Sequence, residues 1–166
     1  MSLSQANARG WGNPGGPKNP KTAAKFEAAN IVKVTGGGIS VRVNRGIAPL
    51  VKYALDQTVI RGYNLAGVAD DWGYANRYIR GSVSTLSNHA WGLALDLNAT
   101  KNPMTSDGKN HTDMPAWMVA LWQSLGFLWG GNYKGIRHDT MHYEYMGTPQ
   151  TAEAMRVQLG LPVWSA

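Results

Sequence analysis

The chain of 166 residues contains no cysteine. Disulfide bonds and thiolate metal sites are therefore both excluded, so any bound metal must be held by nitrogen and oxygen ligands. Long apolar runs are missing too, because no stretch reaches the roughly 18 uninterrupted apolar residues that suggest a membrane-spanning helix. Residues 1–20 also lack the charged start and apolar centre of a secretory signal. We expect no membrane insertion and no signal peptide.

Acidic residues are scarce: 10 Asp and Glu stand against 16 Lys and Arg, which gives a net charge of +6. Such a surface attracts polyanions, among them nucleic acids, anionic lipids and the polymers of bacterial walls. A nucleic-acid-binding groove would need basic residues that follow the aromatic ones. No basic cluster follows the tryptophans, of which Trp117 and Trp122 fall within residues 114–125 and Trp91 falls in the first motif described below. We therefore expect no nucleic-acid partner.

The length and an apolar content of 43% suit one domain with a single core. Residues 8–20 are rich in glycine and proline and poor in large apolar groups. We therefore expect residues 1–20 to form a flexible or loop-like leader with no role in the core. Residues 21–166 are expected to form the single folded domain, which we expect to be a monomer.

Apolar periodicity predicts both helices and strands. Residues 32–43 alternate around three glycines, which indicates a hairpin. Asn44 and Asp113 are candidate N-caps of the helices that follow them. The predicted helices are 21–30, 44–58, 114–125 and 151–159, and the further predicted strands are 92–98, 127–129 and 141–146. Because helices and strands do not alternate regularly, the expected fold class is α+β.

The most informative stretch is SNHAWGLALDLN at residues 87–98, in which His89 precedes Asp96 by seven positions. An ionised Asp96 between Leu95 and Leu97 is costly unless a positive group compensates it, and a metal ion would do so. On a strand, Asp96 would share its face with small residues and point away from the leucine-lined core. The small residues leave room for a ligand or an ion.

A second stretch, RHDTMHYEY at residues 137–145, places Asp139 three residues before His142. Two histidines and one carboxylate are a usual protein set for a catalytic zinc, which leaves a fourth position for water. His89, Asp96 and His142 supply that set. Proton transfer needs a further carboxylate that stays off the metal, and we expect Asp139 to be that group.

The other titratable residues are weaker candidates for the metal. His111 lies in a polar loop and is expected to be solvated. His138 is the rival of His142 because it adjoins Asp139, but it lies in a predicted turn, whereas His142 alternates with Glu144 on one strand face. Glu144 either orients a histidine or forms an ion pair, and the orienting role is favoured.

The string Ser87-Asn88-His89-Ala90-Trp91-Gly92-Leu93-Ala94-Leu95-Asp96, with Asp139-Thr140-Met141-His142, resembles two signatures of the D-alanyl-D-alanine carboxypeptidase family of zinc peptidases. These are Ser-x-His-x-x-Gly-x-Ala-x-Asp and acid-x-x-His. The family includes the VanY and VanX enzymes and the L-alanyl-D-glutamate endopeptidases of phage endolysins. The resemblance extends over residues 60–147 and implies a small antiparallel sheet flanked by helices, as in Hedgehog domains and DD-peptidases.

Carried over residue by residue, the resemblance implies that Zn²⁺ is bound by His89, Asp96 and His142 and that Asp139 is the catalytic acid and base. Aspartate at position 139 resembles the endolysin branch, whereas the vancomycin-resistance dipeptidases have glutamate there. This favours an endopeptidase that cuts the L-Ala-D-Glu bond of peptidoglycan stem peptides. A D-Ala-D-Ala carboxypeptidase or dipeptidase is the alternative.

The family also uses an upstream arginine to stabilise the carbonyl oxygen as it becomes an oxyanion, a role that a guanidinium suits. Arg77 is the first candidate and Arg80 the second, and either could instead be a surface charge on a loop. Ser87 either hydrogen-bonds substrate or fixes the turn before His89. These alternatives stay open on the sequence alone.

A wall-binding module that keeps zinc and lacks catalysis is the rival hypothesis from another functional class. Asp139 argues against it, because a binding module does not need a proton-transfer group beside its metal. The missing export signal suits a phage or prophage lysin, which is made in the cytoplasm of a bacterial host and reaches the cell wall after the membrane is breached.

Overall fold

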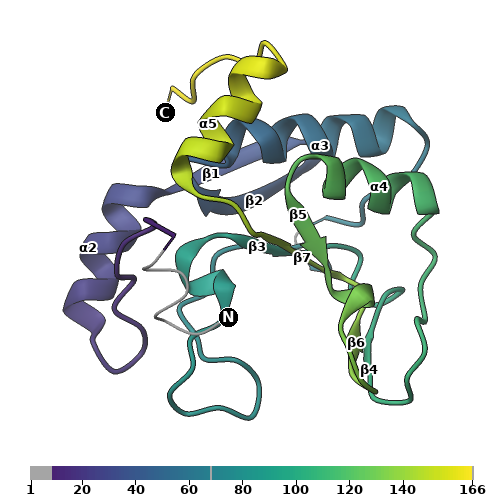
Figure 1. Cartoon of the computed structure of the whole chain (residues 1–166), viewed down its shortest axis with the longest axis horizontal. Helices are drawn as coiled ribbons and strands as arrows, with labels where there is room; N and C mark the ends of the chain where they lie inside the picture. The colour runs from purple at the N-terminus through teal and green to yellow at the C-terminus, as the bar shows by residue number, and fades with distance from the viewer. Residues whose placement is uncertain (1–8, 68, 166) are drawn as a thin grey trace.

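The computed structural model describes residues 9–67 and 69–165 of the chain (Figure 1). Its α-helices are α2 (Pro20–Asn30), α3 (Ala48–Ile60), α4 (Ala116–Ser124) and α5 (Pro149–Gln158). Its strands are β1 (Ile31–Gly36), β2 (Ile39–Asn44), β3 (Ala94–Asp96), β4 (Met104–Thr105), β5 (Phe127–Trp129), β6 (His138–Asp139) and β7 (His142–Tyr145). Helices and small antiparallel sheets confirm the predicted α+β class. Within these residues no helix has the length and apolar character needed to cross a membrane.

The predicted hairpin is confirmed by the antiparallel pair β1 and β2, whose register runs from Ile31 opposite Asn44 to Gly36 opposite Ile39. The helix after it begins at Ala48, so the expectation that Asn44 caps that helix is wrong. The Asn44 side chain is engaged elsewhere: Nδ2 donates to the Trp91 carbonyl at 3.1 Å, and Oδ1 accepts from a backbone N–H two residues on. Asn44 therefore ties the hairpin to the segment that carries the first motif.

A three-stranded sheet in the order β3, β7, β5 forms the centre of the molecule. One face of this sheet carries Leu95 on β3, Tyr143 on β7 and Phe127 on β5, all of which belong to the hydrophobic core. Figure 1 shows α3, α4 and α5 gathered on one side of the molecule, while β4 and β6 project on the other. The sheet therefore separates the helical core from the side on which the candidate site lies.

Helix α4 confirms the predicted helix but begins two residues later, at Ala116 after Pro115. Asp113 does not cap it. The Asp113 carboxylate instead accepts hydrogen bonds from the Tyr63 hydroxyl and from Asn102 Nδ2. The buried network around Asn102 therefore outcompetes the local capping bond that the sequence favoured.

The leader contributes to the core, contrary to expectation. Residues 9–19 contain neither helix nor strand, yet Trp11 is buried and its Nε1 donates to the Gly147 carbonyl at 2.8 Å. The Trp91 Nε1 in turn donates to the carbonyl of Gly12 at 2.8 Å. One indole buries enough apolar surface to anchor a Gly- and Pro-rich segment. Residues 1–8 of the predicted leader lie outside the described residues.

Buried polar groups position the loop that precedes the first motif. Asn98 has a positive φ of 45°, and its N–H donates to Asp71 Oδ1 at 2.8 Å. Its Oδ1 accepts from the Ala66 N–H at 2.7 Å. These bonds hold the loop beside β3, where Trp72 exchanges two backbone hydrogen bonds with Asp96, at 3.0 and 2.8 Å. At Asp96, strand β3 is thus paired with β7 on one edge and with Trp72 on the other.

Candidate metal centre and its cleft

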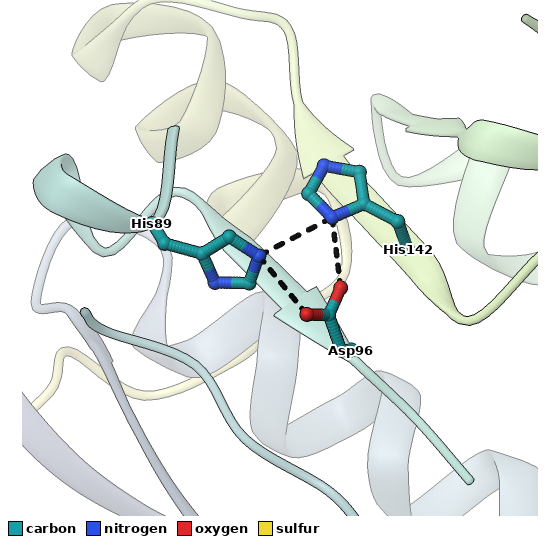
Figure 2. A group of neighbouring side chains, drawn as sticks. All are labelled: His89, Asp96 and His142. Atoms are coloured by element: carbon teal, nitrogen blue, oxygen red, sulfur yellow. Dashed lines mark hydrogen bonds and ion pairs between the residues drawn. The ribbon is translucent and has the colours of Figure 1, made fainter. Parts of the chain in front are cut away.

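Three side chains from separate segments converge on one point (Figure 2). Asp96 on β3 lies directly opposite His142 on β7, and His89 comes from the short 3₁₀ helix η1 (Asn88–Trp91). The distance from Asp96 Oδ1 to His142 Nδ1 is 2.8 Å, and His89 Nε2 lies 3.3 Å from Asp96 Oδ2 and 3.3 Å from His142 Nδ1. All three side chains are buried, and one ligand atom from each lies within 4.8 Å of the others.

The sequence around His89 explains how η1 holds the imidazole over the sheet. Ser87 is the N-cap of η1, and its hydroxyl oxygen accepts from the His89 N–H at 3.4 Å. Gly92 ends the turn with a positive φ of 65°. A Cβ on Gly92 would lie 2.6 Å from the backbone nitrogen of Asn44 and 2.6 Å from Ile31 Cδ1, so only glycine fits there. The motif glycine therefore fixes where the helical turn packs against the hairpin.

Each histidine has one ring nitrogen in the cluster and the other facing an acceptor. The Nδ1 of His89 lies 2.6 Å from the carbonyl oxygen of Gly73, which can only accept, so Nδ1 carries the proton. The Nε2 of His142 lies 3.7 Å from Glu144 Oε2. This arrangement places His89 Nε2 and His142 Nδ1 inside the cluster, where both nitrogens would face a metal ion together with the carboxylate of Asp96. Metal-binding histidines have outer partners of this kind, so the residues fit a metal.

The electrostatics of the protein alone favour a positive charge within the cluster. Burial opposes the ionisation of Asp96, but the charges and hydrogen bonds of His89 and His142 lower the pKa of this carboxyl well below its ordinary value. Burial also opposes the protonation of His142, yet its bonds to Asp96 and Glu144 raise its pKa to about 10. A metal cation would replace that proton and satisfy the same carboxylate.

Glu144 lies beside His142 and is itself held on both oxygens. Asn88 Nδ2 donates to Oε2, and the Tyr133 hydroxyl donates to Oε1 at 3.0 Å. Although burial opposes ionisation, His142 and Asn88 lower the pKa of Glu144 to about 2. Neither Asn88 nor Tyr133 was predicted from the sequence. Asn88 adjoins a predicted ligand and could have been found by position, whereas Tyr133 lies in a loop that offers no signal.

Asp139 lies beside the cluster and outside it. Its strand β6 pairs with β4, so that Asp139 is opposite Met104. Burial raises the pKa of Asp139, an effect that the positive charges of His142, His89 and Arg80 partly offset. Its Oδ1 is buried and has no hydrogen-bond partner among the described residues. The structure thus places a second carboxylate near the cluster with an oxygen available to accept a proton.

The cluster opens into a cleft of about 720 Å³. Its lining includes the predicted residues Arg77, Arg80 and Ser87, together with Tyr133 and Asp139. The Nη1 of Arg77 donates to the neighbouring Tyr78 carbonyl at 3.3 Å, whereas Arg80 interacts electrostatically with Asp139. Ser87 both caps η1 and lines the cleft, so the structure is compatible with either predicted role for its hydroxyl.

The structure leaves two histidines outside the cluster. His111 is exposed, as expected, and its Nε2 pairs with Asp107 Oδ2 at 2.8 Å. His138 is in strand β6, which corrects the predicted turn at this position. Because side chains alternate along a strand, His138 points away from the cleft that Asp139 lines, and its Nδ1 lies 2.5 Å from Asn110 Oδ1.

Comparison with known proteins agrees with this geometry. Residues 80–145 match the family model described as D-alanyl-D-alanine carboxypeptidase. No curated protein and no solved structure matches the chain. The matched segment contains the whole His89, Asp96 and His142 cluster and Asp139. The chain is therefore similar to the D-alanyl-D-alanine carboxypeptidase family over the segment that carries the cluster, which is less than half of its length.

Proposed function

We propose that the protein hydrolyses the L-Ala-D-Glu bond of peptidoglycan stem peptides and that His89, Asp96 and His142 hold its Zn²⁺. The observation that carries this proposal is the placement of Asp139. A half-buried carboxylate lies next to the three-ligand cluster, lines the same cleft and keeps one buried oxygen without a hydrogen bond from the described chain. A site that only bound a metal would not need this group.

Zinc suits the donors that the chain presents. Two imidazole nitrogens and one carboxylate oxygen form a usual three-ligand set for a catalytic zinc, and the cleft gives substrate access to the cluster. When bound, the metal supplies Lewis-acid activation of a water molecule and of the scissile carbonyl group. Glu144 holds the outer nitrogen of His142 and thereby orients a ligand without touching the substrate.

Asp139 would serve first as a base and then as an acid. It accepts a proton from the attacking water molecule and then donates it to the nitrogen of the departing amine. Burial assists this exchange, because a raised pKa brings the ionised and protonated forms of Asp139 closer in free energy at neutral pH. Proton transfer of this kind contributes about 10²- to 10⁴-fold to a rate.

An arginine from the loop of residues 77–80 would stabilise the carbonyl oxygen as it gains negative charge. Both Arg77 and Arg80 line the cleft. Arg77 is the first candidate and Arg80 the second; one guanidinium nitrogen of Arg77 donates to the Tyr78 carbonyl, and the charge of Arg80 lowers the pKa of Asp139. A fixed guanidinium that faces the developing charge lowers the barrier electrostatically.

The choice of bond rests on the aspartate at position 139, which resembles the endolysin branch of the family. A lysin of phage or prophage origin is proposed on the same basis. The family description itself favours the second candidate, cleavage of D-Ala-D-Ala. Mass analysis of muropeptides before and after digestion would name the bond. Products that end in L-Ala support the first candidate, and loss of terminal D-Ala supports the second.

A non-catalytic wall-binding module is the remaining alternative. Purified protein should be loaded with zinc and incubated with sacculi while released amines are counted. Stoichiometric zinc together with release of amines supports the enzyme. Stoichiometric zinc with no released amine from any sacculus preparation would favour the binding module.

A further inference from the structure

Arg137 lines the same cleft as Asp139 and is two residues before it in the chain. Both residues line the cleft, while His138 between them bonds to Asn110 and does not. Arg137 directly precedes strand β6 and is two positions from Asp139, so the two side chains that line the cleft lie on either side of one that does not. Arg77 and Arg80 line the cleft from a different segment, so Arg137 adds a separate positive charge beside the proton-transfer group.

The Arg137 guanidinium has no fixed partner. Across residues 9–67 and 69–165, it makes no hydrogen bond or ion pair. The neighbouring loop contains Asp107 and contacts this segment through a hydrogen bond of 2.9 Å from Gly108 N–H to the Ile136 carbonyl. The Asp107 carboxylate is paired with His111 instead. Arg137 is therefore available to an anionic ligand in the cleft.

The position of Asp139 decides which part of a substrate Arg137 can reach. Under the proposed function, on which this inference rests, Asp139 protonates the departing amine, so the fragment that leaves must lie beside Asp139. We propose that Arg137 binds a free carboxylate on the residue whose amine is released. Arginine suits this role because its planar fork can donate two parallel hydrogen bonds to one carboxylate.

This chemistry is common to both candidate bonds. In a stem peptide, D-Glu that is linked onward through its side chain keeps a free α-carboxylate, and a terminal D-Ala also ends in a carboxylate. In either case the carboxylate belongs to the residue that supplies the leaving amine. Arg137 would therefore select for charge at this residue, and the identity of the scissile bond decides which carboxylate is bound.

Two pairs of synthetic peptides test the inference. One pair contains L-Ala-D-Glu with the D-Glu α-carboxylate either free or as its amide, and the other ends in D-Ala-D-Ala with a free or amidated terminus. The zinc-loaded wild type should show a kcat/KM about 10- to 100-fold higher for the carboxylate of one pair. Arg137→Ala should lower that value to the level of the amide and leave the amide itself unchanged. Lys134→Ala removes an exposed charge from the same segment and is the matched control.

The failures can be told apart. Equal cleavage of both members of a pair by the wild type, or an equal loss for both members in Arg137→Ala, overturns the role of Arg137 and leaves the proposed peptidase standing. If no peptide is cleaved, the proposed function fails. Calorimetric titration of the zinc-loaded protein with the same peptides then tests whether Arg137 binds the carboxylate. Binding that favours the carboxylate peptide and is lost in Arg137→Ala supports the inference. Absence of such binding overturns it. Comparison of the melting curves of each variant and the wild type tests whether the variants are folded.

Discussion

Asp96 and His142 lie directly opposite each other in the register of β3 and β7, with Asp96 Oδ1 2.8 Å from His142 Nδ1. A metal held by both side chains would join the two strands at this point. We expect His142→Ala to abolish stoichiometric zinc binding, because one of three protein ligands is lost. Metal content after dialysis against a metal-free buffer measures this. Stoichiometric zinc in the variant would remove His142 from the ligand set.

Asp139→Ala should behave in the opposite way. Zinc content is expected to stay stoichiometric, because Asp139 is outside the cluster, while turnover falls about 10²- to 10⁴-fold. Release of amines from sacculi, measured beside metal content on the same preparation, separates the two effects. Wild-type turnover in this variant would mean that another group moves the proton.

The outer partners of His142 are expected to tune metal affinity. Glu144→Gln removes the charge that faces His142 Nε2, and zinc affinity should fall about 10- to 100-fold. Tyr133→Phe removes only the hydroxyl that holds Glu144 and should have a smaller effect in the same direction. Tyr78→Phe changes another tyrosine of the cleft and is the control. Competition with a chelator gives the affinities, and equal values for all four proteins would exclude the orienting role.

Zinc affinity should rise with pH. In the metal-free protein the pKa of His142 is raised to about 10, so below that pH a proton occupies the nitrogen that the metal needs. Binding must displace this proton, so the apparent association constant should increase about tenfold per pH unit between about pH 7 and 9. A histidine with an ordinary pKa near 6.5 would give a plateau above about pH 7.5. Chelator competition at constant ionic strength distinguishes the two curves.

Gly92→Ala should destabilise the fold. The new Cβ would lie 2.6 Å from Asn44 N in a backbone with a φ of 65°, so steric overlap adds to backbone strain. We expect the free energy of unfolding to fall by at least about 2 kcal/mol. Gly108→Ala is the matched control, because its φ is 75° but no atom lies within 4 Å of the added Cβ. Denaturant unfolding of both variants measures the difference, and equal losses would show that the clash is relieved at no cost.

Local patterns in the sequence predicted those helices and strands that are set by interactions between residues close together in the chain. Alternation fixed the hairpin, and 3.6-residue periodicity placed α3 and α4 to within a few residues. The caps were wrong at Asn44 and Asp113, because distant partners compete for the same side chains. Trp11 was missed in the core for a similar reason, since the composition of a segment says nothing about the cavity that one indole can fill.

The chemistry of the site follows from the sequence, because residue types set which atoms can bind a metal. Without cysteine, imidazole and carboxylate ligands were the remaining choice. The aspartate in an apolar strand indicated the site, because its ionised form is costly to bury without a compensating positive charge. The convergence of these ligands was decided only by the tertiary structure. The contacts of Gly73, Asn88 and Tyr133 with His89 and Glu144 join segments far apart in the chain. Such contacts arise from strand register and from loops without periodicity, and a short motif encodes neither.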